Sequence, residues 1–193
     1  MAAFTTRALD AGTWPHFAAL AEAHNGVWNG CWCMAFHDFA EDGVSHAKNR
    51  AEKERRVRSG DAHASLVYDG DTCVGWCQFG SPEELPRIKN KKAYEKDVDQ
   101  RPDWRITCFF SGKGHRRQGV ADAALRGALQ EIARLGGGVV EGYPDDPDLG
   151  KLSASFLWCG TTPLFERQGF ERVRLIGKTR WVMRKKVRRR AQR

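Results

Sequence analysis

The sequence predicts a layered α/β or α+β fold, and three of its features lead to this prediction. Two short β-type runs are joined by an Asp-Gly pair, the strongest local sign of a β-hairpin. The segment 118–135 repeats apolar residues at i, i+4, i+7 and i+8, the spacing of a helix with one buried stripe. A strand, a second helical segment and a closing hairpin then follow. We therefore expect a sheet covered by helices.

The N-terminal third is expected to contain one strand and two helices. Residues 4–8 form a short β-type run, and Asp10 or Thr13 can cap the helix that follows it. The segment 27–37 is dense in Trp, Cys and Phe and is expected to be extended. The polar segment 42–60 is rich in helix-forming residues, so we expect a surface helix that ends near its terminal glycine.

The middle of the chain is expected to be a β-meander with one interruption. The two arms of the hairpin are 64–68 and 72–79. The segment 81–103, which contains three prolines, interrupts the meander and has room for one short helix within 87–97. Residues 104–110 are rich in β-forming residues and are expected to form the next strand.

The C-terminal elements follow from the same reasoning. Three consecutive glycines stop the helix at 136–138, because glycine tolerates the left-handed conformation that follows a helix end. The remaining elements are expected to be a strand over 139–143, a helix within 156–168 and a hairpin formed by 172–176 and 179–184.

Length and composition exclude several classes of protein. With 193 residues, 41% hydrophobic and 29% charged, the chain is typical of one folded domain and not of a disordered protein. No apolar run approaches the ~18 residues of a membrane-spanning helix, and residues 1–14 lack the apolar stretch of a secretory signal. We expect a cytoplasmic protein with one domain over 1–183 and a basic tail over 184–193.

The net charge of +8 lies mostly in that tail. Seven positive charges and no acidic residue occur in 184–193, so the rest of the chain is nearly neutral. The basic residues form one terminal run without interleaved aromatic residues, unlike a platform on which bases stack. A nucleic-acid-binding protein is therefore the weakest of the hypotheses. Because no segment is long and apolar enough to span a bilayer, we expect no membrane partner either.

The six cysteines do not have the paired two-residue spacings of a zinc site. We expect reduced thiols, several of them within apolar strands, and no metal.

The loop 111–121 carries the clearest functional signal. It joins a strand to a helix, and unpaired N–H groups together with the helix dipole favour an anion at such a helix start. Gly119 permits close approach of a phosphate, and Arg116 and Arg117 add charge. A pyrophosphate site is one interpretation, and a solvated basic turn is the other. The P-loop pattern fails after Gly119, and the dinucleotide fingerprint fails at Arg117.

Two segments carry a resemblance to a known family. Arg116–Ala121 fits the pattern Gln or Arg, two residues, Gly, one residue, Gly or Ala, and Leu164–Phe170 has the form Leu-aromatic-Glu-x-x-Gly-Phe. In this order they resemble the acyl-CoA motifs of the GNAT superfamily of N-acetyltransferases, over residues 64–183. The resemblance implies a mixed, mostly antiparallel central sheet, splayed between the strand near 104–110 and the strand near 138–143.

The resemblance also implies a cofactor and a reaction. Acetyl-CoA would pair its pantetheine arm with the backbone of Cys108, Phe109 and Phe110, and a backbone N–H of this strand would stabilise the oxyanion. A primary amine of a small molecule or peptide would attack the thioester directly. The pyrophosphate would lie on the backbone amides of Arg116, Arg117, Gln118, Gly119, Val120 and Ala121.

For the general base we choose Glu141, the only carboxylate inside the predicted central strands, where an apolar cleft can raise its pKa. The alternative is that Glu141 points to solvent or pairs with an arginine. His115 is a weaker candidate at the phosphate end. The family's acid is a tyrosine, which is Phe165 here, so the thiolate would leave with help from water, from Tyr143 or from Cys159, or unaided.

The acceptor site is suggested by aromatic and acidic residues. Trp28, Trp32, Trp76 and Phe79 occur in segments that surround the acceptor in this family, although such residues are also typical of a core. Asp145 begins an acidic turn that could attract a cationic amine or simply be solvated. The segment 81–103 could form a wall or lid over the acceptor.

The leading hypothesis is thus an acetyl-CoA-dependent N-acetyltransferase. A non-catalytic acyl-CoA-binding regulatory protein is the alternative, motivated by Phe165 in place of tyrosine. The sequence leaves the oligomeric state open, with a homodimer among the alternatives.

Overall fold

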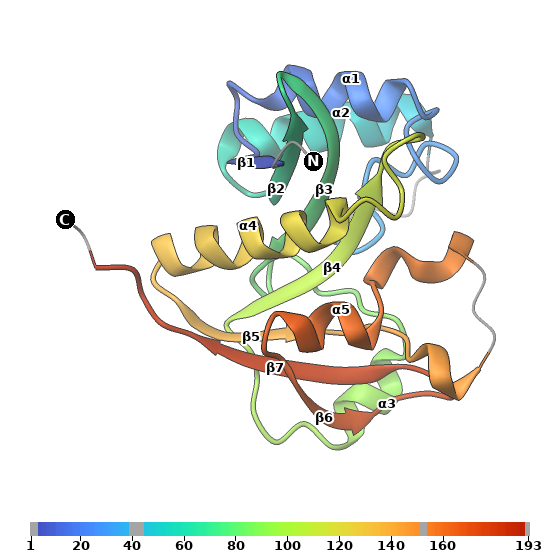
Figure 1. The fold of residues 1–193 in the computed structure, drawn as a ribbon, viewed down its shortest axis with the longest axis vertical. Coiled ribbons are helices and arrows are strands. Elements are labelled where there is room, and N and C mark those ends of the chain that lie inside the picture. The colour runs from blue at the N-terminus through green and yellow to red at the C-terminus, as the bar shows by residue number, and fades with distance from the viewer. Residues whose placement is uncertain (1–3, 39–44, 151–153, 192–193) are drawn as a thin grey trace.

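A seven-stranded sheet forms the centre of the computed structural model, which describes residues 4–38, 45–150 and 154–191 (Figure 1). The strand order is β1-β2-β3-β4-β5-β7-β6, and every neighbouring pair is antiparallel except β4 and β5. The predicted class, a mixed and mostly antiparallel sheet, is confirmed. The strands are β1 (Thr5–Ala8), β2 (His63–Asp69), β3 (Thr72–Gly80), β4 (Trp104–Ser111), β5 (Gly138–Gly142), β6 (Glu171–Leu175) and β7 (Trp181–Val187).

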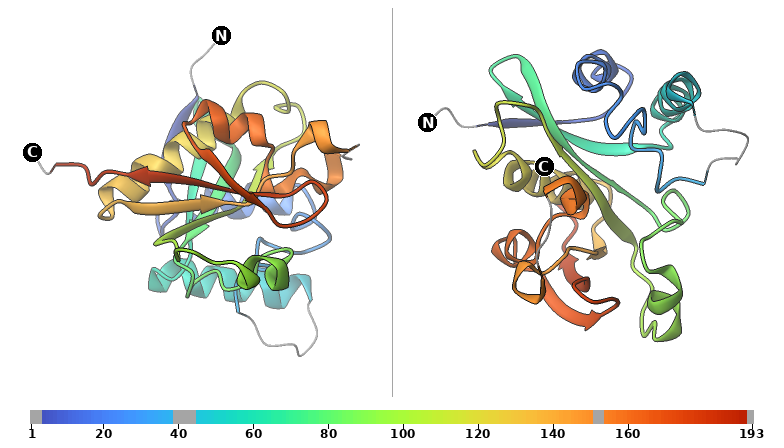
Figure 2. Two further views of the ribbon diagram at one scale, coloured as in Figure 1. Left: turned by 90° about the horizontal axis from the view of Figure 1, so that it is seen from below. Right: turned by 90° about the vertical axis from the view of Figure 1, so that its right-hand side faces the viewer.

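Helices cover both faces of the sheet. Helices α1 and α2 lie together on one face, and α4 and α5 lie on the opposite face (Figure 2). None of the helices within the described ranges is long and apolar enough to cross a membrane. The helices are α1 (Trp14–Glu22), α2 (His46–Ser59), α3 (Lys91–Lys96), α4 (Val120–Arg134) and α5 (Thr162–Arg167), with 3₁₀ turns at Pro147–Leu149 and Ala154–Cys159.

The helix ends follow the sequence signals. Ser45 caps α2 by accepting a hydrogen bond from the Lys48 amide, and Gly60 closes the helix in the left-handed conformation with φ 79°. Residues 42–44 of the predicted helix lie outside the described residues. The buried stripe of α4, which includes Ala124 and Leu125, packs on the sheet as its period predicts.

The parallel pair β4 and β5 holds the feature that positions the site. Their register consists of Trp104↔Val140, Arg105↔Glu141 and Ile106↔Gly142, and it stops there. β5 ends at Gly142, whereas β4 continues to Ser111. The predicted splay is therefore present, and beyond Ile106 the edge of β4 on the side of β5 has no strand partner among the described residues.

The segment 27–37, which we expected to be extended, is not a strand. Six consecutive residues, 25–30, have φ between 49° and 86°, and the Cys31 amide donates to the Val27 carbonyl at 2.8 Å. A left-handed turn of this kind costs about 1–2 kcal/mol for each non-glycine residue. Burial of Val27 and Trp32 in the core beside α1 offsets that cost.

Two glycines in this left-handed turn, which we call the 25–30 turn, are required by close contact. A Cβ at Gly26 would lie 2.6 Å from the His46 ring, and one at Gly30 would lie 2.9 Å from His46 Cβ. The start of α2 therefore rests directly on the turn.

The boundary of the tail is also different from the prediction. β7 continues to Val187, so Arg184, Lys185 and Lys186 pair with β5 as part of the sheet. The Lys185 ammonium donates to the Gln168 carbonyl. A basic tail can begin only after Val187, not after Met183.

Candidate active site

A groove of about 860 Å³ lies beside the part of β4 that has separated from β5. Its walls are the end of β4, the loop before α4, the first turn of α4, the turn around Trp158 and the start of α5. Most of the residues that we predicted to bind the cofactor line it: Phe109, Phe110, Arg116, Arg117, Gly119, Val120 and Ala121.

One end of the groove is suited to an anion. Gly119 is the N-cap of α4 with φ 89°, and no side chain caps the helix there. The first N–H groups of a helix have no intrahelical partner, so those at the start of α4 are donors for a ligand. The exposed side chains of Arg116 and Arg117 lie beside them and add two positive charges.

Two of the predicted cofactor residues are oriented differently. Gln118 folds back, and its Nε2 donates to the Gly114 carbonyl at 2.6 Å. Cys108 directs its side chain to the opposite face of the sheet, into the core beside α1. Only the backbone of Cys108 can face the gap between β4 and β5.

Glu141 does not lie in the groove. Its side chain is fully buried, and its Oε1 forms an ion pair with Arg184 at 2.8 Å. Its Oε2 accepts hydrogen bonds from Tyr94 at 2.8 Å and from Tyr143 at 3.2 Å. The second reading of the sequence, a carboxylate paired with an arginine, describes this geometry, and a general base at Glu141 has no access to the groove.

The groups considered as acids are likewise not brought to the groove. Tyr143 is buried against Glu141, and burial raises its pKa well above the ordinary value. Cys159 is buried, and desolvation raises its pKa. Phe165 is fully buried, with its ring 5.9 Å from that of Phe109 and packed over Gly142.

A second pocket, of about 350 Å³, lies on the other side of β4. Its lining includes the side chain of Cys108 and parts of the 25–30 turn and of the segment after β3. Trp28 and Trp158 line both the pocket and the groove, and their rings are 5.7 Å apart. The pocket and the groove therefore meet at this tryptophan pair.

Comparison with known proteins identifies the fold. No protein-family model and no curated protein matches the sequence. Solved structures do match: aminoglycoside 6'-acetyltransferase type Ii has a TM-score of 0.56 at 14% identity, over 97% of this chain and 99% of that chain. YncA from Salmonella typhimurium, solved with its cofactor acetyl-CoA, has a TM-score of 0.52 at 14% identity, over 99% and 98%.

A third neighbour is the PaiA N-acetyltransferase from Thermoplasma acidophilum in complex with coenzyme A, with a TM-score of 0.51 at 12% identity, over 96% and 99% of the two chains. The chain has the GNAT acetyltransferase fold. The resemblance inferred from Arg116–Ala121 and Leu164–Phe170 is thereby confirmed for the fold.

Within this GNAT fold, the predicted acceptor residues are mostly core residues. Trp32 and Trp76 are fully buried, and neither lines the groove or the pocket. Trp76 stacks beneath Phe110, with ring centroids 4.7 Å apart. Asp145 is 5% exposed and ion-paired with Arg180 at 2.5 Å, so it is not a free acidic attractant.

Two histidines, His115 and His24, lie near the loop that precedes α4. His115 lies near Asp69, at 3.6 Å, outside the groove lining. His24 accepts a hydrogen bond from the Lys113 amide at 3.0 Å and packs edge-on against Phe110, which the sequence pattern did not indicate.

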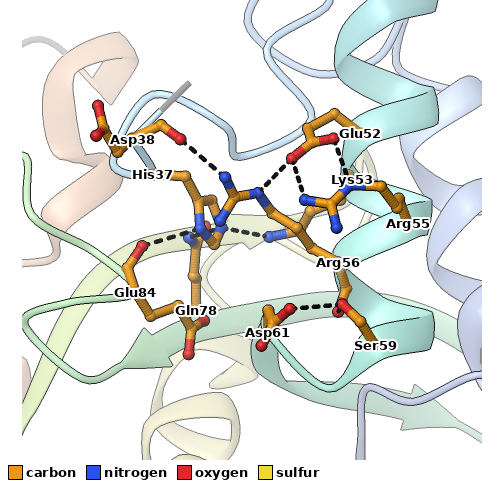
Figure 3. A network of polar contacts seen from close by, with 10 residues as sticks. All are labelled: His37, Asp38, Glu52, Lys53, Arg55, Arg56, Ser59, Asp61, Gln78 and Glu84. Carbon is orange, nitrogen blue, oxygen red and sulfur yellow. Dashed lines mark hydrogen bonds and ion pairs between the residues drawn. The ribbon is translucent and has the colours of Figure 1, made fainter. Parts of the chain in front are cut away.

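The GNAT fold of this chain also contains a network of polar contacts beside α2, in which His37, Lys53 and Gln78 are buried (Figure 3). Nε2 of His37 lies 3.1 Å from Lys53 Nζ and 3.0 Å from Gln78 Nε2, and its Nδ1 lies 3.1 Å from the Glu84 carbonyl. Burial, reinforced by the charge of Lys53, lowers the pKa of His37 to about 2. The ring is therefore neutral at physiological pH, with its Nδ1–H donating to the Glu84 carbonyl and Nε2 accepting.

The same burial acts on the neighbouring groups. Desolvation lowers the pKa of Lys53, which is 1% exposed. Cys33 Sγ lies 3.2 Å from Cys108 Sγ and accepts a hydrogen bond from Trp76 Nε1 at 3.1 Å. The contact with the Cys108 thiol lowers the pKa of Cys33 and raises that of Cys108. The sequence spacing gave no sign of the contacts around His37, because His37, Lys53, Gln78 and Glu84 come from four different segments.

Proposed function

We propose that the chain is an N-acetyltransferase that transfers an acyl group from acetyl-CoA to a primary amine. The observation that carries the proposal is the groove at the splay of β4 and β5, which ends on the uncapped start of α4 beside Arg116 and Arg117. A pyrophosphate fits these donors and charges, and an extended arm fits the open edge of β4. Neighbours of the same fold hold acetyl-CoA or coenzyme A.

The roles of the residues follow from this placement. Bound acetyl-CoA supplies an acyl thioester. The backbone amides of Arg116–Ala121 bind the pyrophosphate, and the open backbone edge at Phe109 and Phe110 binds the arm and offers an N–H to the developing oxyanion. The amine nitrogen attacks the carbonyl carbon directly. Glu141 has a structural role in this proposal, since its carboxylate is ion-paired with Arg184 and accepts hydrogen bonds from two tyrosines.

Coenzyme A binding tests the groove assignment. Gly119→Glu places a carboxylate at the anion end of the groove, so we expect calorimetry to show a loss of binding of at least a hundredfold. Gly136→Glu is the matched control, because both glycines have positive φ, a Cβ at either meets nothing within 4 Å, and Gly136 lies at the other end of α4. Equal affinities for the two variants would refute the assignment.

Thiol release separates the enzyme from the alternative. Release of free coenzyme A from acetyl-CoA in the presence of amines is the expected result for an N-acetyltransferase. Binding of acetyl-CoA without thiol release across a broad amine panel would instead support the acyl-CoA-binding regulatory protein. That alternative is suggested by Phe165, which is buried and has no hydroxyl group.

A further inference from the structure

The second pocket has an unusual lining for a site that is expected to receive an amine. Its side chains are apolar or sulfur-bearing except at the mouth, and in the part of the chain that the structure describes no carboxylate or carboxamide lines it. The apolar members are Trp28, Phe36, Ile88 and Trp158, and the three thiols are Cys31, Cys33 and Cys108. Such a pocket binds an uncharged, apolar body.

The pocket reaches the strand at which the acyl group would be held. Side chains alternate along β4, so Cys108 faces the pocket while Phe109 faces the groove. The backbone edge between them is the one left open by β5. A ligand in the pocket can therefore present its nitrogen to that edge through the junction formed by Trp28 and Trp158.

The charges around the pocket disfavour a cation. Arg87 and Lys89 lie at the mouth; Arg87 is 3.5 Å from the exposed carboxylate of Asp38, and Lys89 Nζ is 5.1 Å from the Trp158 ring. Among the described residues, the charged side chains at the mouth are therefore these two cations and the carboxylate of Asp38.

The acidic turn at Asp145 and Asp146 supplies no free carboxylate to bind a cation. Asp145 is paired with Arg180 at 2.5 Å, and Asp146 is paired with Arg172 at 2.6 Å, while both carboxylates are nearly inaccessible. Neither can receive the ammonium group of an acceptor.

We infer, resting on the acyl transfer proposed above, that the acceptor is a monoamine with an apolar body, bound as the neutral amine. An apolar cavity whose described lining includes cations but no carboxylate favours the uncharged form of an amine, which is the nucleophilic form. No carboxylate base is then needed in the pocket. In the reaction the N–C bond forms, the C–S bond breaks, and the amine proton ends on the thiol of coenzyme A or in solvent, giving the amide and free coenzyme A.

Two amines that differ only at one end test the inference. Hexylamine and 1,6-diaminohexane have the same chain, but the diamine must bring a second ammonium group into the pocket or its mouth. Burying an unpaired charge is costly enough that we expect kcat/KM for hexylamine to exceed that for the diamine at least about a hundredfold. A diamine that reacts as well as hexylamine, or better, would overturn the inference while leaving acyl transfer intact.

Two variants of Cys31 test whether the lining of the pocket sets the preference for hexylamine over the diamine. Cys31 is half-buried in the pocket lining, so Cys31→Asp adds a carboxylate there, and Cys31→Asn is the uncharged control of the same size. We expect the Asp variant to lower the ratio of kcat/KM for hexylamine to kcat/KM for the diamine at least tenfold, and the Asn variant to retain this ratio. An unchanged ratio in a folded Asp variant, as judged by circular dichroism, would count against the pocket as the acceptor site.

The failure of the inference can be told from the failure of the proposed function. Absence of coenzyme A binding and of thiol release with every amine sinks the function. If coenzyme A binds but neither amine reacts, saturation-transfer NMR in its presence decides: binding of hexylamine and not of the diamine supports the inference, and no binding of hexylamine refutes it.

Discussion

His37 offers a quantitative test of the network of polar contacts beside α2. Its pKa is lowered to about 2, mainly by burial, whereas an unfolded histidine titrates near 6.5. Between these values the unfolded chain binds a proton that the folded chain does not, so stability falls as the pH falls below 6.5. The limiting slope is about 1.36 kcal/mol for each pH unit.

The perturbation is His37→Gln, which keeps a polar side chain but removes the titration. From the difference in pKa, His37 lowers the free energy of unfolding of the wild type by about 2 kcal/mol between pH 7 and pH 5. The variant is expected to start less stable, because the contacts with Lys53 and the Glu84 carbonyl change, but to lose about 2 kcal/mol less over this interval.

Urea unfolding followed by tryptophan fluorescence at pH 7, 6 and 5 gives both values. His115→Gln is the matched control, since His115 lies outside the network and is partly exposed, and it should change the pH dependence less than His37→Gln. Equal losses of stability in wild type and His37→Gln between pH 7 and pH 5 would show that His37 is not held neutral in the folded protein.

Three further predictions concern the frame of the site. Arg184→Met leaves the buried carboxylate of β5 without its ion pair and should cost about 3–5 kcal/mol in urea unfolding, whereas Arg188→Met, exposed beyond β7, should change stability by less than about 0.5 kcal/mol. Equal effects would contradict the extension of β7. Gly142→Ala brings a Cβ within 2.1 Å of the Phe165 ring and should cost about 1–3 kcal/mol by thermal unfolding; an unchanged melting temperature would mean that the ring moves freely. With a thiol reagent, Cys31 should react before the other five thiols of the native protein, because they are buried and it is half-buried, although burial raises its pKa; all six should react quickly in the unfolded chain. A first phase that survives in Cys31→Ser would contradict this burial pattern.

The sequence was sufficient for the elements whose signals are local. The Asp-Gly hairpin, the stripe of α4 and the glycine that caps α2 each depend on neighbouring residues, and all are present. The residues at this end of the groove could be singled out for the same reason, because Arg116, Arg117 and Gly119 are close together in the chain, and their role in binding an anion stays a prediction.

Tertiary contacts decided what the sequence did not show. The 25–30 turn is stabilised by burial of Val27 and Trp32 and by the contact of its glycines with His46, none of which a propensity can report. The sequence also left two readings of Glu141 open, a general base and a carboxylate paired with an arginine, and the structure shows the pairing. A strand presents alternate residues to opposite faces, so a carboxylate correctly placed in β5 can still lie on the face away from the groove.

A break in this alternation explains how β4 directs neighbouring side chains into the pocket and into the groove. Ile106 and Phe109 both pack on the α4 side although they are three residues apart, because the register with β3 slips between Gln78 and Phe79 and leaves Thr107 as the extra residue. Without this bulge, Cys108 would share the face of Ile106. The bulge therefore directs Cys108 into the pocket, leaves Phe109 in the groove, and places both beside the backbone edge that β5 leaves open. In the proposed reaction, the acceptor and the acyl donor would approach this one strand from opposite faces.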